Sequence, residues 1–137
     1  MLVLLDLPGQ ILGVAALVAL LFVLGGKQRV MDIQLYNTYF VLDLPSLALG
    51  AALLLGLNAL PYWGFPQASW VPWLTVSQVV LLIVSTFALL LIALFFKMLI
   101  AKGANFRRIQ RLIYRLIGLF LLGQLLGIAN WLSALVN

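Results

Sequence analysis

Residues 74–96 read LTVSQVVLLIVSTFALLLIALFF, and this apolar run decides the class of fold. The run carries no charge, and its polar members are Gln78 and small hydroxyl residues. A helix of about 18 or more apolar residues is long enough to cross the roughly 30 Å hydrocarbon core of a bilayer. The run therefore predicts a transmembrane helix.

Working outward from this run, the chain contains three further apolar segments. Gly25 and Gly26 end the first of them, and Pro61 ends the second. We therefore expect an all-α integral membrane protein, a four-helix transmembrane bundle that forms a single domain over residues 1–137. Its expected spans are residues 8–24, 44–60, 74–96 and 112–135.

The composition supports the same class. Apolar residues make up 66% of the chain and charged residues only 8%. A soluble domain has about 25% charged residues. So few charges could not cover a surface that faces water.

The positive charges predict the orientation of the bundle. All eight Lys and Arg residues lie in the first and third loops or beside them. Basic loops of membrane proteins usually face the cytoplasm. We expect loops 25–43 and 97–111 in the cytoplasm and both termini outside, in a bacterial inner membrane. The tryptophans, concentrated in the second loop and at Trp131, would mark the opposite interface.

The basic third loop has a simple interpretation in terms of lipid. Its cationic side chains would attract anionic headgroups, and a nucleic-acid partner is not expected for a polytopic protein. The residues concerned are Lys102, Arg107, Arg108 and Arg111.

The absence of two residue types limits the chemistry. The chain has no cysteine and no histidine, which excludes thiolate catalysis and the commonest metal ligand. We therefore expect no catalytic, metal-binding or cofactor-binding residue, no cofactor and no enzymatic activity.

Asp43 is the acidic residue closest to a predicted span. It would cap the second helix or pair with Arg115 at similar depth. The alternative is a proton or ion pathway, because ionisable groups inside a membrane are candidates for function.

Other residues predict contacts between helices. Small residues four apart let helix backbones approach closely, as on the second span (Ala48, Ala52, Gly56) and the fourth (Gly123, Gly127). The isolated polar residues Asn58, Gln124 and Asn130 predict hydrogen bonds between helices, with a role as substrate ligands as the alternative.

One stretch stands out from these apolar runs: Asp32-Ile33-Gln34-Leu35-Tyr36-Asn37-Thr38-Tyr39-Phe40-Val41. It resembles the segment that leads into the tenth transmembrane helix of haem–copper oxidase subunit I, and similar stretches occur in small bacterial membrane proteins. The resemblance covers about ten residues and does not extend to the family's ligands. The positions of its magnesium-region His and Asp are Tyr36 and Asn37, and those of its haem-ligating histidines are Leu44 and Ser46. No metal or haem role is carried over.

The aromatic members of this stretch remain to be assigned. Tyr36, Asn37, Tyr39 and Phe40 would form an aromatic anchor at the inner face, or a docking surface for a partner such as a respiratory complex. A small-molecule site is the third alternative.

Two functions from different classes follow. The first is a non-catalytic accessory or scaffold subunit, in contact with membrane lipids, that assembles with other membrane proteins or with copies of itself. The alternative is a small transporter or channel that uses Asp43 with Arg115.

Overall fold

The computed structural model describes residues 8–25, 30–35, 38–64, 70–103 and 105–136. The described elements, in chain order, are α2 (Pro8–Leu21), the 3₁₀ helix η1 (Phe22–Gly25), β1 (Val30–Leu35), β2 (Thr38–Asp43), α3 (Leu44–Gly64), α4 (Pro72–Ala101) and α5 (Phe106–Val136).

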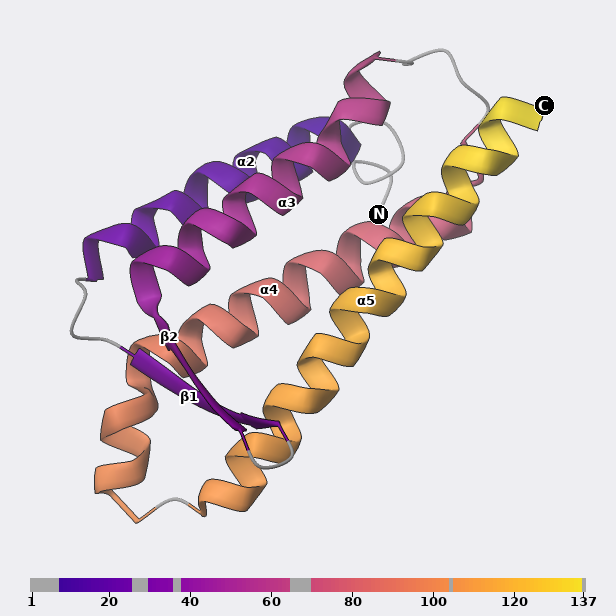
Figure 1. Cartoon of the computed structure of the whole chain (residues 1–137). Coiled ribbons are helices and arrows are strands. Elements are labelled where there is room, and N and C mark those ends of the chain that lie inside the picture. The colour runs from indigo at the N-terminus through magenta and orange to yellow at the C-terminus, as the bar shows by residue number, and fades with distance from the viewer. Residues whose placement is uncertain (1–7, 26–29, 36–37, 65–69, 104, 137) are drawn as a thin grey trace.

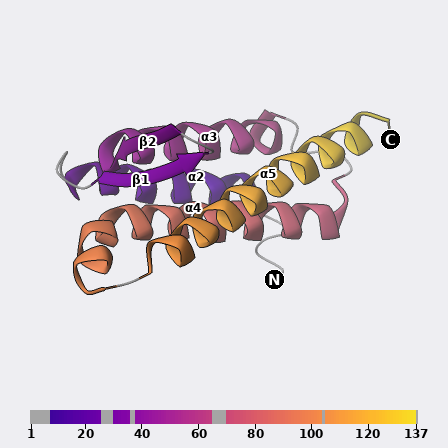
Figure 2. The same cartoon turned by 60° about the horizontal axis from the view of Figure 1, so that its bottom comes forward.

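The helices form two antiparallel pairs. α2 packs mainly on α3, and α4 packs mainly on α5 (Figures 1 and 2). α4 also contacts α2 and α3, so it lies at the centre of the bundle. The first residues of α2 and the last residues of α5 therefore lie at one end of the molecule, and the hairpin and the α4–α5 turn lie at the other.

Three helices are long and apolar enough to cross a membrane, namely α3, α4 and α5. They have 21, 30 and 31 residues, which at 1.5 Å per residue is about 31, 45 and 46 Å. The predicted first span differs, because its α-helix has 14 residues and covers only about 21 Å before the 3₁₀ turn begins. It is a shorter apolar helix, Pro8–Leu24 by composition.

The helix ends also depart from the sequence prediction. α3 continues past the expected end and includes Pro61, since a proline in the last turn removes one helical hydrogen bond without stopping the chain. α5 begins six residues before the expected span, because the basic segment continues the same helix. The Asn105 side-chain oxygen caps this start, accepting a hydrogen bond from the Arg107 amide at 2.9 Å.

The expectation of an all-α chain is wrong for the first loop. β1 and β2 form an antiparallel hairpin whose register pairs Val30 with Asp43 and Leu35 with Thr38. The sequence of β1, VMDIQL, alternates apolar and polar residues from Met31 onward, which is the period of a strand. The segment that resembles the oxidase stretch, residues 32–41, is therefore mostly strand.

The hairpin lies at the end of the bundle where α4 and α5 extend furthest (Figure 1). β1 packs on α4 and, less extensively, on α5. Ile33 is buried there and belongs to the same core as the helices. The two longer helices thus support the hairpin beyond the ends of α2 and α3.

The α2–α3 interface is built from small residues. On α3 the buried positions include Ala48, Ala52 and Ala59, and on α2 they include Ala15 and Ala19. Small side chains let the two backbones come close. Gly56 differs, because a Cβ built there meets nothing within 4 Å. Residues four apart on a helix differ in direction by about 40°. Gly56 is eight residues after Ala48, so it lies about 80° around the helix from Ala48 and outside the packed face.

This difference predicts opposite outcomes for two similar substitutions. Ala48→Leu should overpack the core around the fully buried Ala48 and lower stability by about 1–3 kcal/mol. Gly56→Leu should leave stability unchanged or slightly raise it, since glycine disfavours helix. Thermal unfolding in detergent, followed by circular dichroism, measures both. Equal losses for the two variants would contradict this account of the interface.

Candidate functional site

Polar side chains from three helices meet at the end of the bundle that holds the start of α4. Asn58 and Tyr62 come from α3, Thr75 and Gln78 from α4, and Gln124 and Asn130 from α5. Spacings of four and three residues place the pair on α3 and the pair on α4 each on one side of its helix. Gln124 and Asn130 are six residues apart, so their side chains leave α5 in directions about 120° apart. We call these six residues the polar chain.

Asn130 holds one end of the polar chain and is fully buried. Its Oδ1 accepts a hydrogen bond from the Val71 backbone N–H at 2.9 Å. Its Nδ2 donates to Thr75 Oγ1 at 2.8 Å and to the Tyr62 hydroxyl at 3.2 Å. One amide therefore ties α5 to both α3 and the start of α4.

Asn58 holds the other end. The Tyr62 hydroxyl donates to Gln78 Oε1, and Gln78 Nε2 donates to Asn58 Oδ1 at 3.0 Å. Asn58 Nδ2 in turn donates to the Leu54 carbonyl at 2.8 Å and to Gln124 Oε1 at 3.2 Å.

Backbone groups at both ends fix the direction of this chain. The Val71 N–H requires the oxygen of Asn130 to face it, and the Leu54 carbonyl requires the nitrogen of Asn58. The Tyr62 hydroxyl and the amides of Gln78 and Gln124 then each have one orientation in which every bond of the chain joins a donor to an acceptor. The last donor, Gln124 Nε2, is buried and has no partner among the described residues.

Glycines on α5 make room for this arrangement. A Cβ built at Gly127 would lie 2.3 Å from Gln78 Nε2, and one at Gly123 would lie 3.0 Å from Leu82 Cδ2. The predicted small residues of the fourth span thus lie directly against α4. Close packing at Gly127 brings the Gln78 amide into reach of Asn58 and Tyr62.

Aromatic residues surround the polar chain. The rings of Tyr62 and Trp70 lie 4.6 Å apart. A cavity of about 120 Å³ opens beside them, between α3 and α5, lined by the amides of Asn58, Gln78 and Gln124 and by residues that include Pro61, Trp70 and Trp131. On the other side of α3, Trp63 lies over Gly9 and Gly13 of α2.

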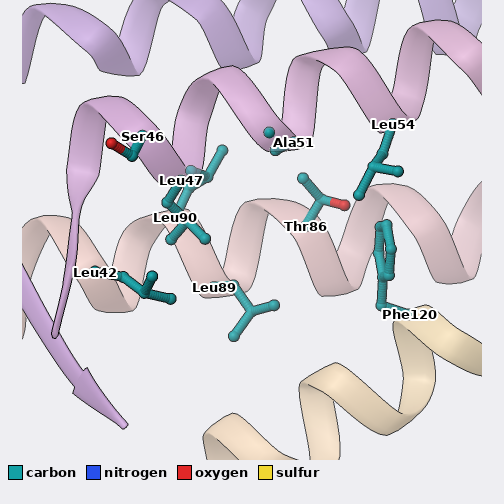
Figure 3. Close-up of a pocket in the computed structure, with 10 residues that line it drawn as sticks. Leu42, Ser46, Leu47, Ala51, Leu54, Thr86, Leu89, Leu90 and Phe120 are labelled. Carbon is teal, nitrogen blue, oxygen red and sulfur yellow. The ribbon is translucent and has the colours of Figure 1, made fainter. Parts of the chain in front are cut away.

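A second cavity, of about 270 Å³, lies nearer the hairpin, between α3 and α4, with Phe120 of α5 at its far end (Figure 3). Its wall is almost entirely apolar, with Leu47 and Leu54 from α3, Leu89 and Leu90 from α4, and Phe120 from α5. Thr86 lies in this wall, and its buried hydroxyl has no partner among the described residues.

Asp43 is the last residue of β2 and immediately precedes α3, so it occupies the position of a helix cap. Its side chain is half-buried and has an interaction partner. Arg115 is exposed on α5. Pairing between the two stays a prediction.

The aromatic surface falls only partly within the described residues. Phe40 is exposed on β2 at 47% of its surface, and Tyr39 is part of the same strand. Tyr36 and Asn37 lie outside the described residues.

The basic residues of the third loop gather where α4 ends and α5 begins. Lys102 follows α4 directly. Arg107, Arg108 and Arg111 occupy the first two turns of α5, and all of these side chains are exposed.

The prediction of hydrogen bonds between helices is confirmed for Asn58, Gln124 and Asn130. The sequence did not point to Tyr62, Thr75 or Gln78 as their partners. Tyr62 follows Asn58 by four residues, and that spacing was the available signal. The partners on α4 depend on how the helices are aligned, which composition does not reveal.

Comparison of the chain with protein-family models, with curated proteins and with solved structures gave no match. Within the described part of the chain, no three His, Cys, Asp or Glu residues come together as a metal site would require. The polar chain consists of amides and hydroxyls, whose chemistry here is hydrogen bonding.

The packing at Gly127 gives a prediction with a control on the same helix. Gly127→Ala should lower stability, by about 1–3 kcal/mol, because the new methyl overlaps the Gln78 amide. Gly118→Ala meets nothing within 4 Å and should raise stability, by up to about 1 kcal/mol. Unfolding of both variants in the same detergent measures the difference. A stabilised Gly127→Ala protein would show that the polar chain is not closely packed.

Proposed function

We propose that this chain is an integral membrane protein with four spans, and that it serves as a non-catalytic accessory or scaffold subunit for other membrane proteins. The three long apolar helices support membrane insertion. In this proposal α2 and η1 together form the remaining span, which is the first in the chain. Their combined rise of about 29 Å is close to the hydrocarbon thickness.

The distribution of residues along the bundle supports an orientation. Trp63, Trp73 and Trp131 lie toward the end that holds the start of α4, while Lys102 and Arg107 lie at the opposite end. Tryptophan marks membrane interfaces, and basic residues mark the cytoplasmic side. We therefore place the hairpin in the cytoplasm and both termini outside, in a bacterial inner membrane.

The proposal of a scaffold role rests on the exposure of β2, the outer strand of the hairpin. β1 packs against α4, whereas β2 contacts chiefly the helix that follows it. On β2, Phe40 and Val41 are exposed at 47% and 63% of their surface. A two-stranded sheet is marginally stable alone, and an open strand edge can pair with another chain. An apolar strand edge outside the hydrocarbon core is suited to a protein partner.

The polar chain supports the same role. Its side chains bond to one another across three helices and so fix the alignment of α4 and α5, whose opposite ends contact β1. The resemblance of residues 32–41 to the oxidase segment makes a respiratory complex the partner class we propose. That stretch contains the last four of the six residues of β1 and the first four of the six residues of β2.

Mass spectrometry of the complex extracted in mild detergent tests this function. We expect a stoichiometric membrane-protein partner with the unmodified chain and a marked loss of that partner with Phe40→Ser. Thr38→Ser, which changes an exposed residue of the same strand, is the matched control and should keep the partner.

A circular dichroism melt of each variant separates loss of a contact from loss of the fold. An isolated chain in every extract, or equal recovery with Phe40→Ser and Thr38→Ser, would count against the scaffold role.

The orientation has its own test, because the chain has no cysteine of its own. We expect Val136→Cys to react with a membrane-impermeant maleimide added to intact cells. Lys102→Cys should react only after the membrane is opened. The reverse pattern would place the basic loops outside and refute the assignment.

A further inference from the structure

The cleft bounded by α3, α4 and Phe120 of α5, called the α3–α5 cleft below, is an apolar feature that the scaffold role leaves unused. Its apolar part, of about 270 Å³, is bounded by Leu42 at the hairpin end and by Leu54 and Phe120 at the other (Figure 3). Gly50 lines it, and a Cβ built there meets nothing within 4 Å. Pockets for small ligands measure about 300–1,000 Å³, and a helix is about 10–12 Å across. The cleft therefore fits a single slim chain and not a partner helix.

One polar group in this wall lacks a partner. Thr86 is 3% exposed, and its hydroxyl makes no hydrogen bond with a described residue. Its neighbour Ser85 behaves differently, because its hydroxyl donates to the Leu81 carbonyl at 2.6 Å. Leaving a buried hydroxyl unsatisfied is unfavourable. A threonine hydroxyl in a helix can bond to a carbonyl of the preceding turn, but that of Thr86 makes no such bond in the described helix. The Thr86 hydroxyl can thus turn into the cleft.

The depth of Thr86 restricts what can meet it. Gly123 packs on Leu82 and Asn130 bonds to Thr75, so the antiparallel register puts Thr86 level with Phe120. Phe120 is eleven residues before Trp131 on α5, or about 16 Å along the axis. If Trp131 marks the interface, as in the proposed topology, Thr86 lies near the middle of the roughly 30 Å hydrocarbon core. Charged headgroups do not reach that depth without a large cost.

We propose that the α3–α5 cleft binds an uncharged aliphatic chain that ends in a carbonyl group, such as a long-chain ketone or ester. The hydrocarbon tail lies along Leu47, Leu89 and Leu90, and the carbonyl oxygen accepts a hydrogen bond from Thr86. The inference rests on the membrane topology proposed above and is independent of any protein partner.

The test uses the full chain in lipid nanodiscs and three probes of equal length. These are 2-dodecanone labelled with ¹³C at the carbonyl, dodecane, and dodecanoate. We expect 2-dodecanone to bind about 3- to 10-fold more tightly than dodecane, the effect of one hydrogen bond. Its ¹³C resonance should shift on binding, and dodecanoate should bind more weakly than the ketone.

Two pairs of variants assign the site. Thr86→Val keeps the shape and removes a hydroxyl that bonds to nothing in the described structure, so the preference for the ketone should disappear. Ser85→Ala, on the same helix, should retain it. Gly50→Leu should abolish binding of both uncharged probes by filling the cleft. Gly56→Leu, a glycine of the same helix with equally open surroundings, should not.

Equal affinity for 2-dodecanone and dodecane would overturn the proposal, and so would an unchanged preference in Thr86→Val. If dodecanoate bound more tightly than 2-dodecanone, the proposal that the ligand is uncharged would be wrong. Binding that survives in Gly50→Leu would overturn the cleft as the site. Mass spectrometry of the extracted complex remains the separate test of the scaffold role, so failure of one does not imply failure of the other.

Discussion

The structure depends on how amide side chains are satisfied where water is scarce. Asn58 and Asn130 each bond to a backbone group and to side chains of other helices. Helices in lipid lack the hydrophobic drive that brings them together in water, so packing and hydrogen bonds must align them. The two asparagines set the register of three helices at one end of the bundle. Gly123 and Gly127 then allow α5 to approach α4 closely enough for those bonds to form.

The unequal lengths of the helices organise the other end. α4 and α5 are longer than α3 by about nine or ten residues, and they extend past it toward the basic turn. The hairpin occupies the space beside this extension and contributes Ile33 to the common core. One end of the protein is therefore a tightly bonded polar contact of three helices, and the other is a small mixed layer of strand and helix.

Much of this fold could be predicted from the sequence, because apolar length and charge asymmetry are local properties. The four apolar segments, their order and the interhelical role of Asn58, Gln124 and Asn130 were all readable. The hairpin was missed because the alternation in Met31–Leu35 is short and follows long helical runs.

The remaining features could not be read from the chain because they depend on how helices are aligned. Gly56 belongs to the same four-residue repeat as Ala48 and Ala52, yet only the alanines are buried. Thr86 and Ser85 are adjacent hydroxyls with different surroundings. Sequence spacing identifies a face of a helix, whereas the neighbour that covers it is decided by the tertiary arrangement.

The fixed direction of the polar chain makes its six side chains behave as a unit. From the Val71 N–H to Gln124, each successive group donates to the next. Hydrogen bonds in such a series polarise one another. The series ends in an N–H at Gln124, which lines the smaller cavity and has no acceptor among the described residues. Reversing one amide within the series would make one pair of donors and one pair of acceptors face each other. A change at one amide therefore disturbs the contacts of its neighbours on the other helices.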